Sequence, residues 1–453
     1  MEQNKIILKK DGLSAVFLKN GDLYQLCKNE IMINQLNGNN LDGSVNQIYL
    51  RILEKGQIFA VPLTGSNSKS EFWYDQNQLS WSGSYAGVIY QVDFVIGSAN
   101  TWFWRVNLSG SGQRADLLFG QDLGIAAKAM IKANEAYVSQ YIDHHITTDS
   151  HGYVISSRQN QQQRGCNPVV EHGCLNRTTG FSTDGYQFFG NDYKKCDKPR
   201  ALCQSKLDNE VYQYEFAYSA LQTDLLELHE NQMETIVFYG MVCDDHPKAV
   251  EAPIGKRSEV LSLFEQICFA KPGQGRHINK QIGEVLTGLS LNDTELEQLF
   301  SKRVQVERDN DTILSFFTDH YHHVVLKEKE YRMERSHGQI ILSGTDVIVD
   351  RPLMSSTLYM SGIFNSQIAL GNTSMNKLLS NSRNALNVQK LSGQRIYLKA
   401  QDEWQLLTMP SAFEIALNSA TWYYKLVDDM LTITTYCLSD AREIRTEISS
   451  QSG

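Results

Sequence analysis

Residues 87–108, GVIYQVDFVIGSANTWFWRVNL, carry the clearest secondary-structure signal in the chain. Apolar and polar side chains alternate in both halves, with a period of two residues. In the second half, one face of the pattern carries Trp102, Trp104, Val106 and Leu108, and in the first half one face carries Val88, Tyr90, Val92, Phe94 and Ile96. This period is typical of strands with one buried face. The stretch therefore predicts half-buried antiparallel strands.

Turn-forming stretches separate similar patterns on both sides of this segment. They read NGD, NGNNLDG, TGSNSKS and WSGSYAG. Their spacing is typical of meandering antiparallel sheets rather than of units in which strands and helices alternate. We therefore predict a large antiparallel β-sandwich over residues 1–255.

A helical pattern begins near residue 256. One face of the first predicted helix carries Val260, Leu261, Phe264, Ile267 and Cys268. A second helix is expected at NDTELEQLF, where Asn292 and Glu295 have the spacing of a capping box. Residues 256–310 are therefore predicted to form a helical connector.

Strand patterns return after residue 310. Four of them are QRIYLKA, EWQLLTM, TWYYKLV and MLTITTYCL. In TWYYKLV, adjacent aromatic residues face opposite ways on a strand, which favours burial of at least one of them. We predict a second β-sandwich over residues 311–453. We expect it to be incomplete, because the chain ends without an obvious closing element.

Composition narrows the classes of function. The chain has 453 residues, 42% of them hydrophobic and 21% charged, with a net charge of -9. These values are typical of a globular protein, and the acidic balance without a basic run argues against nucleic acid as a partner. No apolar run approaches the ~18 residues of a membrane span, and the N-terminus lacks the apolar core of a signal peptide. We expect a cytoplasmic protein.

Two histidine-containing segments are candidates for a metal site. Cys166, Cys174, Cys196 and Cys203 lie close together in the sequence, with His172 between the first two. No C-x-x-C pair is present, so free thiols are the simpler interpretation. In TDHYHH, strand alternation would place His320 and His322 on one face, without carboxylates to complete a site. We predict no metal ion.

Residues 119–145, FGQDLGIAAKAMIKANEAYVSQYIDHH, allow two interpretations. In the first, polar side chains including Gln121, Asp122, Asn134, Glu135, Gln140, Tyr141, Asp143, His144 and His145 face a sugar. Amides and carboxylates pair with vicinal hydroxyls, and Tyr141 can stack on a pyranose ring. In the second, these side chains connect loops, and residues 136–141 alternate as an ordinary strand. Arg158 is a separate ligand candidate, because a guanidinium group matches phosphate or paired hydroxyls.

Several long strings resemble a known family. DLLFGQDLGIA, NEAYVSQYIDHH, SSRQNQQQ and TDGYQFFG resemble the N-terminal sandwich of glycoside phosphorylases related to cellobiose and chitobiose phosphorylase. VVLKEKEYRMERSHGQII, LMSSTLYMSGIFNSQIALGNTSMNKLLS, SGQRIYL and PSAFEIAL are similar to the longer members, which act on 1,2-β-oligoglucans or belong to cyclic β-1,2-glucan synthase. The resemblance implies a mutarotase-like supersandwich fold. It also implies an inverting reaction, in which phosphate attacks the anomeric carbon and an aspartic acid of a catalytic (α/α)6 barrel protonates the glycosidic oxygen.

The pattern of the family is not matched in full, because no repeat of helical hairpins is present in these residues. We therefore expect the barrel to be absent and the chain to be the N-terminal carbohydrate-binding and supporting portion of such an enzyme, inactive alone. A non-catalytic carbohydrate-binding or assembly module is the alternative. The expected partners are a β-linked glucan oligosaccharide and a separately encoded catalytic barrel. Inorganic phosphate is the co-substrate of the complete enzyme, and no other cofactor is expected. No catalytic residue is assigned, and the predicted substrate-binding residues are Tyr141, Asp143, His144, Arg158, Gln159 and Asn160.

Overall fold

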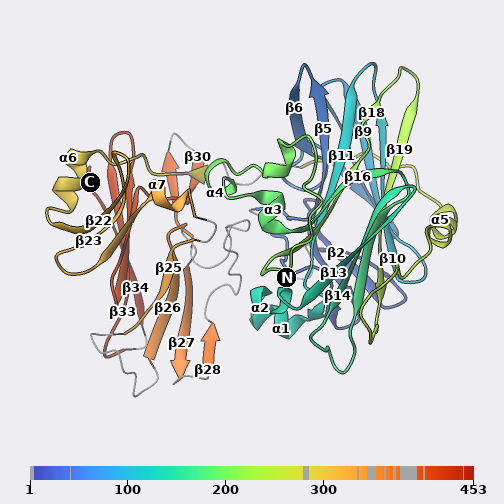
Figure 1. The fold of residues 1–453 in the computed structure, drawn as a ribbon. Helices are drawn as coiled ribbons and strands as arrows, with labels where there is room; N and C mark the ends of the chain where they lie inside the picture. Colours follow the sequence, from blue (N-terminus) through green and yellow to red (C-terminus); the bar gives the residue numbers. More distant parts are fainter. Residues whose placement is uncertain are drawn as a thin grey trace. The chain divides into compact units, whose positions relative to one another are not determined.

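The computed structural model describes residues 5–40, 42–133, 135–278, 285–333, 336–343, 353–361, 364–370, 374–377, 395–400, 403–441 and 443–452. The chain divides into two compact units. The first unit comprises residues 1–190 and 198–281, and the second comprises residues 282–453 with the short segment 191–197. Strands are the main secondary structure of each unit (Figure 1).

The largest sheet of the first unit has nine strands. In spatial order they are β13 (Ile142–Asp149), β14 (Gly152–Gln159), β15 (Val169–Cys174), β19 (Met233–Cys243), β10 (Thr101–Ser109), β9 (Val88–Ile96), β8 (Gln78–Tyr85), β7 (Glu71–Tyr74) and β20 (Arg276–His277). All of their pairings are antiparallel. β13 is therefore an edge strand of this sheet.

Two smaller sheets and several short helices complete the first unit. The six-stranded sheet contains β16 (Thr178–Asp184), β17 (Ala217–Thr223), β11 (Arg114–Asp122), β5 (Gln47–Glu54) and β6 (Gln57–Pro62), with β18 (Leu226–Glu227) beside β11. The five-stranded sheet contains β1 (Lys5–Lys10), β2 (Leu13–Leu18), β3 (Leu23–Lys28), β4 (Ile31–Met32) and β12 (Ala126–Ala127). The helices are α1 (Lys128–Ala133), α2 (Glu135–Ser139), α3 (Gly185–Phe189), α5 (Arg257–Glu265) and a 3-10 turn (Arg200–Leu202).

The alternation in residues 87–108 is confirmed. β9 and β10 pair with Phe94 opposite Trp104, and both side chains are buried in a core that all three sheets of the unit share. Across this core, the ring of Phe119 on β11 stacks on Phe238 of β19 with centroids 5.2 Å apart. Burial of side chains of this size contributes roughly 1.5–3 kcal/mol each, so the alternation positions the sheet. The predicted mainly β fold, with a large antiparallel sandwich, is confirmed.

A long segment, residues 244–270, crosses the face of the nine-stranded sheet that is opposite this core. We call this segment the strap. Its α5 lies beside β10 and β19 (Figure 1), where Phe264 contacts the ring of Phe103 at 5.5 Å. Near its C-terminal end, the backbone N–H of Ala270 donates to the Gln78 side chain over 2.8 Å. The strap is thus held to the sheet largely by side chains.

The predicted apolar face of the first connector helix is wrong in part. Val260 is buried as expected, but Leu261 is 43% exposed. The helix ends at Glu265, so Ile267 and Cys268 lie beyond it, and Cys268 is exposed. Phe264 and Ile267 do pack against the cluster that contains Val260, so the apolar face is narrower than predicted.

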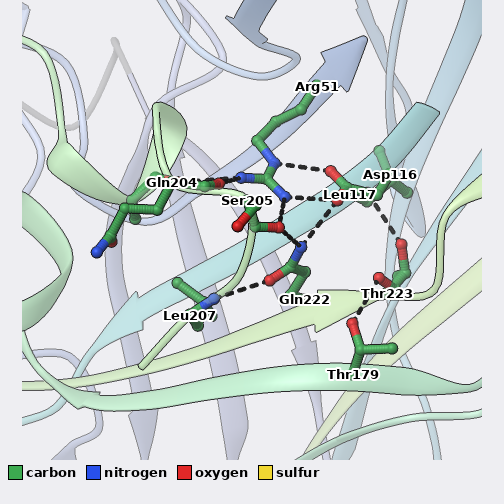
Figure 2. A network of polar contacts seen from close by, with 10 residues as sticks. Arg51, Asp116, Leu117, Thr179, Gln204, Ser205, Leu207, Gln222 and Thr223 are labelled. Carbon is green, nitrogen blue, oxygen red and sulfur yellow. Dashed lines mark hydrogen bonds and ion pairs between the residues drawn. The ribbon is translucent and has the colours of Figure 1, made fainter. Parts of the chain in front are cut away.

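The outer face of the six-stranded sheet contains a buried ion pair, which Figure 2 shows. The guanidinium group of Arg51 on β5 donates to both carboxylate oxygens of Asp116 on β11, over 2.7 and 2.5 Å. It also donates to backbone carbonyls of residues 201–205, including that of Gln204. Gln222 on β17 donates to Asp116 over 2.9 Å and accepts from the backbone of Leu207 over 2.9 Å. The network thereby fixes the loop 200–207 against the sheet.

The described residues of the second unit form three sheets. The seven-stranded sheet consists of β22 (Arg303–Asp309), β23 (Thr312–Thr318), β24 (His323–Leu326), β31 (Ala412–Ile415), β32 (Ser419–Lys425), β33 (Met430–Cys437) and β34 (Ile444–Ser450). The four-stranded sheet has β25 (Gly338–Ile341), β26 (Leu353–Tyr359), β27 (Phe364–Leu370) and β28 (Ser374–Lys377). The three-stranded sheet has β21 (Val285–Leu286), β30 (Glu403–Leu407) and β29 (Tyr397–Ala400), and the helices are α4 (Tyr193–Cys196), α6 (Asp293–Leu299) and α7 (Lys327–Glu330).

The four strands predicted near the C-terminus are confirmed as β29, β30, β32 and β33. Trp422 and Tyr424 are buried in one core, so the aromatic run in β32 is structural. The capping box is also confirmed, because Asn292 accepts from the backbone of Glu295 over 2.9 Å and the reciprocal bond is present. α5 packs in the first unit and α6 in the second, while the predicted connector boundaries at residues 255 and 310 remain a prediction.

Two predicted strand segments are wrong. Residues 135–139 form the helix α2, because burial of Glu135, Val138 and Ser139 follows helical rather than alternating spacing. Residues 319–322 form a turn between β23 and β24, closed by a bond from the Thr318 backbone N–H to the carbonyl of His322 over 2.9 Å. His320 and His322 therefore do not share a strand face.

Candidate functional site

The predicted substrate-binding residues lie around β13 and β14, at the edge of the nine-stranded sheet. Asp143 on β13 is opposite Arg158 on β14, and His144 is opposite Ser157. Side chains alternate along each strand, so neighbouring residues in the sequence face opposite sides of the sheet. The predicted residues are therefore divided between the core, the face under the strap and the exposed edge.

Arg158 is buried under the strap. Its Nε donates to the carbonyl of His246 over 2.7 Å, and Nη2 donates to the carbonyl of Pro247 over 2.9 Å. Its Nη1 donates to the side chain of Asn160. The guanidinium group thus fastens the strap to β14 in this structure. A ligand would have to take these donors from carbonyl groups, and the ligand role of Arg158 remains a prediction.

Arg158→Ala is expected to lower the free energy of unfolding by about 1–3 kcal/mol, because it leaves partly buried strap carbonyls without donors. The measurement is urea denaturation followed by tryptophan fluorescence. Arg164→Ala is the matched control, because the Arg164 side chain is 73% exposed and its ion pair with Glu30 is long, at 3.9 Å. Unchanged stability of Arg158→Ala, combined with weaker binding of glucan or phosphate, would instead support the ligand role.

Gln159 and His144 point into the interior. Gln159 is fully buried and donates to the carbonyls of Gly124 and Val138 over 3.3 and 3.2 Å. The His144 Nδ1 lies 2.9 Å from the hydroxyl of Ser157, and burial lowers the pKa of this imidazole to about 4. Both side chains therefore lie in the interior, where they bond to neighbouring protein groups, and neither is exposed at the sheet edge.

Tyr141, Asp143 and Asn160 are the predicted residues with accessible side chains. The Tyr141 hydroxyl donates to the hydroxyl of Tyr137 over 3.1 Å, with the two rings edge to face at 5.1 Å. This bond raises the pKa of Tyr141. The pair belongs to a wider exposed surface.

Residues 210–215 bring further tyrosines to the same edge. The rings of Tyr212 and Tyr214 stack with centroids 5.9 Å apart, and they are 38% and 49% exposed. Gln140 joins the two segments, because its Nε2 donates to Glu215 over 3.2 Å and its carbonyl accepts from Gln213 over 2.9 Å. We call the group Tyr137, Tyr141, Tyr212 and Tyr214, together with the polar residues Gln140, Gln213 and Glu215, the tyrosine surface.

This surface has the composition of a site for polyhydroxylated ligands. Tyrosine rings offer apolar faces with a polar tip, while amides and carboxylates accept hydrogen bonds from hydroxyl groups. The sequence analysis found Tyr141 but missed Tyr212 and Tyr214. The alternating tyrosines of VYQYEF, residues 211–216, were the available signal.

Three other polar residues of the stretch 119–145 lie in the interior of the first unit. Gln121, Asp122 and Glu135 are buried. Asp122 accepts from the backbone of Leu36 over 2.5 Å and from Asn46 over 2.7 Å, and burial raises its pKa to about 7. Its carboxyl group therefore anchors the loop before β5. Asn134 lies outside the described residues.

No metal-binding cluster is found among the residues that the structure describes. All eight cysteines lie in the described part of the chain, and none of them forms a disulfide bond. Within the same residues, no helix is long and apolar enough to cross a membrane. The longest described helix has 9 residues, so the described residues contain no helical barrel.

The fold and the site define a protein of two β-rich units, the first of which exposes a surface of tyrosines, amides and a carboxylate. Comparison with known families places these units in a family. Residues 16–240 match the SOGP N-terminal domain, and residues 300–453 match the glycoside phosphorylase supersandwich domain. The chain belongs to this glycoside phosphorylase family, of which it covers the N-terminal and supersandwich regions.

One similar protein is a 1,2-β-oligoglucan phosphorylase from Listeria innocua. It is 38% identical over 446 residues, which are 98% of this chain and 40% of that protein. The chain therefore spans less than half the length of this relative. The family resemblance inferred from the sequence strings is confirmed.

Solved structures with detectable likeness include a candidate aldose 1-epimerase from Escherichia coli K12 and a candidate kojibiose phosphorylase from the human microbiome. The first has a TM-score of 0.31 and 8% identity, and covers 52% of this chain and 98% of its own. The second has a TM-score of 0.29 and 8% identity, and covers 57% of this chain and 32% of its own.

Proposed function

We propose that this chain is the N-terminal, carbohydrate-binding and supporting portion of an inverting β-glucan phosphorylase. The complete enzyme would convert β-1,2-glucan and phosphate into glucose 1-phosphate and a shortened glucan. The proposal includes a cytoplasmic setting and a catalytic barrel, encoded separately or as a further part of the protein, that supplies the general acid.

The similarity to the 1,2-β-oligoglucan phosphorylase carries this proposal, because it extends along 98% of the chain. The tyrosine surface supports the binding role, since it offers stacking rings beside hydrogen-bonding amides and carboxylates. The second candidate is a carbohydrate-binding or assembly module without its own chemistry. It is favoured by the described residues themselves, which lack a helical barrel.

The 453-residue chain alone is expected to release no glucose 1-phosphate from β-1,2-linked gluco-oligosaccharides and phosphate. The same oligosaccharides are expected to bind, as measured by isothermal titration calorimetry. The double variant Tyr212→Ala/Tyr214→Ala should weaken binding by about tenfold or more, because stacking and aromatic contacts contribute roughly 1 kcal/mol each.

The matched control for binding is Ile89→Ala, which removes a side chain that is exposed on another part of the first unit. It should leave affinity unchanged. Robust release of glucose 1-phosphate by the isolated chain would overturn the assignment of chemistry to a further domain, and Asp143 would then be the first acid to replace. Lack of any oligosaccharide binding would overturn the binding role. Activity that appears on addition of the remaining domain would favour the phosphorylase over the independent module.

A further inference from the structure

A histidine-rich groove of about 700 Å³ opens on the second unit, far along the sequence from the tyrosine surface. It is lined by the end of β23, the turn 319–322 and the first residue of β24. β25 and the turn between β31 and β32 form its other wall. We call it the histidine groove. Four of its side chains are imidazoles, namely His320, His322, His323 and His337.

Two of these imidazoles are oriented by carboxylates. The Nδ1 of His322 lies 2.8 Å from Glu414, and the Nδ1 of His337 lies 2.6 Å from the buried Glu330. A carboxylate accepts, so each Nδ1 carries the proton and donates. In a neutral ring the remaining nitrogen, Nε2, is then an acceptor.

Two amide side chains of the groove likewise use an N–H group to donate to the protein. Gln339 donates its Nε2 to the carbonyl of Ala416, and Asn418 donates its Nδ2 to the carbonyl of Leu342 over 3.3 Å. Their oxygens are left as acceptors. None of the described residues that line the groove is a lysine or an arginine. A groove that offers these acceptors and no fixed cation favours a ligand that is rich in hydroxyl donors and disfavours an anion such as phosphate.

Tyr321 provides an aromatic face beside these acceptors. Its side chain is 81% exposed, although it belongs to a groove-lining turn. Its backbone has a φ of 60°, in the left-handed region that a bulky residue rarely adopts. Strain of this kind is concentrated at ligand sites. Glycine would adopt this backbone without strain, so replacement of Tyr321 by glycine would remove the ring and keep the turn.

We propose that the histidine groove is a second carbohydrate site, in which hydroxyl groups of a β-linked glucan donate to the imidazole and amide acceptors while a sugar ring packs on Tyr321. The choice of glucan as ligand rests on the proposed function. The inference that the groove binds a hydroxyl-rich ligand rests on the orientation of the side chains around it.

The test uses the full chain and diethyl pyrocarbonate, which acylates accessible imidazole nitrogens. Saturating β-1,2-linked gluco-oligosaccharide is expected to slow modification of His320 and His322 by about fivefold or more, as followed by peptide mass spectrometry. His229, exposed on the first unit, provides the internal reference and should react at an unchanged rate. Tyr321→Gly should abolish the protection without loss of folding, because glycine accepts the left-handed backbone.

Trp404→Ala is the matched control, since Trp404 is an exposed aromatic residue of the second unit outside the groove. It should retain protection, as should the Tyr212→Ala/Tyr214→Ala variant. Oligosaccharide that binds by calorimetry but leaves His320 and His322 equally reactive would overturn the groove while the proposed function stands. Protection that persists in Tyr321→Gly would overturn the role of the ring. Absence of both calorimetric binding and protection would overturn the groove and the carbohydrate-binding function together.

Discussion

Arg51→Met is expected to lower the free energy of unfolding of the first unit by about 3–5 kcal/mol. Methionine fills much of the same volume but removes every donor that Arg51 gives to Asp116. Both side chains of this pair are almost completely inaccessible to solvent. Asp116 would keep only the amide of Gln222 as a side-chain partner, at 2.9 Å, and would remain a buried carboxylate without its cation. Denaturant titration of the purified chain measures the change.

An exposed ion pair is the matched control for this prediction. Arg445→Met removes a guanidinium group that lies 2.7 Å from Glu443, with both side chains about half exposed. Because water replaces such contacts, the free energy of unfolding should change by at most about 1 kcal/mol. The double variant Arg51→Met/Asp116→Leu should recover much of the lost stability, since it leaves no buried charge. A loss below about 1 kcal/mol for Arg51→Met alone would show that the loop 200–207 opens and lets water reach Asp116.

His172→Phe is expected to make the protein less sensitive to acid. His172 is fully buried between aromatic rings, with Trp102 and Phe119 centroids at 5.7 and 5.5 Å. Burial lowers the pKa of this imidazole to about 3 from its ordinary 6.5. Below pH 6.5 the unfolded chain therefore takes up a proton that the folded chain refuses, so this group's contribution to stability is lost as the pH falls from 6.5 toward 3.

The size of this loss of stability follows from the difference between the pKa of His172 in the folded and in the unfolded chain. At 1.36 kcal/mol per pKa unit, lowering the pH from 7 to 4 costs about 3 kcal/mol through His172. Buried acids act in the opposite direction, because burial raises the pKa of Asp22 to about 6 and of Asp122 to about 7. Their folded forms take up protons first, so acid favours folding through them between about pH 4 and 7. The informative quantity is thus the difference between variant and parent, which removes these shared contributions.

The measurement is the free energy of unfolding at several pH values between 4 and 7. His172→Phe and His172→Leu differ in packing, so their stabilities at pH 7 should differ. Both lack the titrating group, so both should retain about 2–3 kcal/mol more than the parent protein when the pH is lowered to 4. Parallel pH profiles for parent and variants would contradict the prediction and would mean that His172 is solvated in the folded protein.

The sequence predicts this fold wherever a local pattern coincides with burial. The alternation around Trp104 and the capping box at Asn292 depend only on neighbours within a few residues, and both are confirmed. α2 was missed because the burial of Val138 comes from distant partners such as Met32, not from its own segment. The turn at Tyr321 was missed because a left-handed tyrosine contradicts the usual residue preferences.

The candidate site was harder to predict because its residues have partners that are distant in the sequence. Arg158 has the composition of a ligand-binding residue, but the carbonyls that occupy it belong to His246 and Pro247, nearly ninety residues later. Tyr141 was found, whereas its neighbours Tyr212 and Tyr214 come from a segment some seventy residues away in the sequence. The chemical groups of the side chains can be read from a single stretch of sequence. The groups that bond to these side chains, or that lie beside them in a site, depend on the folded topology.

The manner in which the strap is attached has a consequence for the dynamics of the first unit. Within the sheet, β19 and β10 share a continuous ladder of backbone pairs, so they can separate only cooperatively. The strap is instead attached at separate points, such as Arg158 at one end and Gln78 at the other. A segment held in this way can detach as a local opening unit at a fraction of the global unfolding free energy. Detachment would bare the sheet face that carries Phe103 and Glu171 while the opposite core, around Trp104, stays closed.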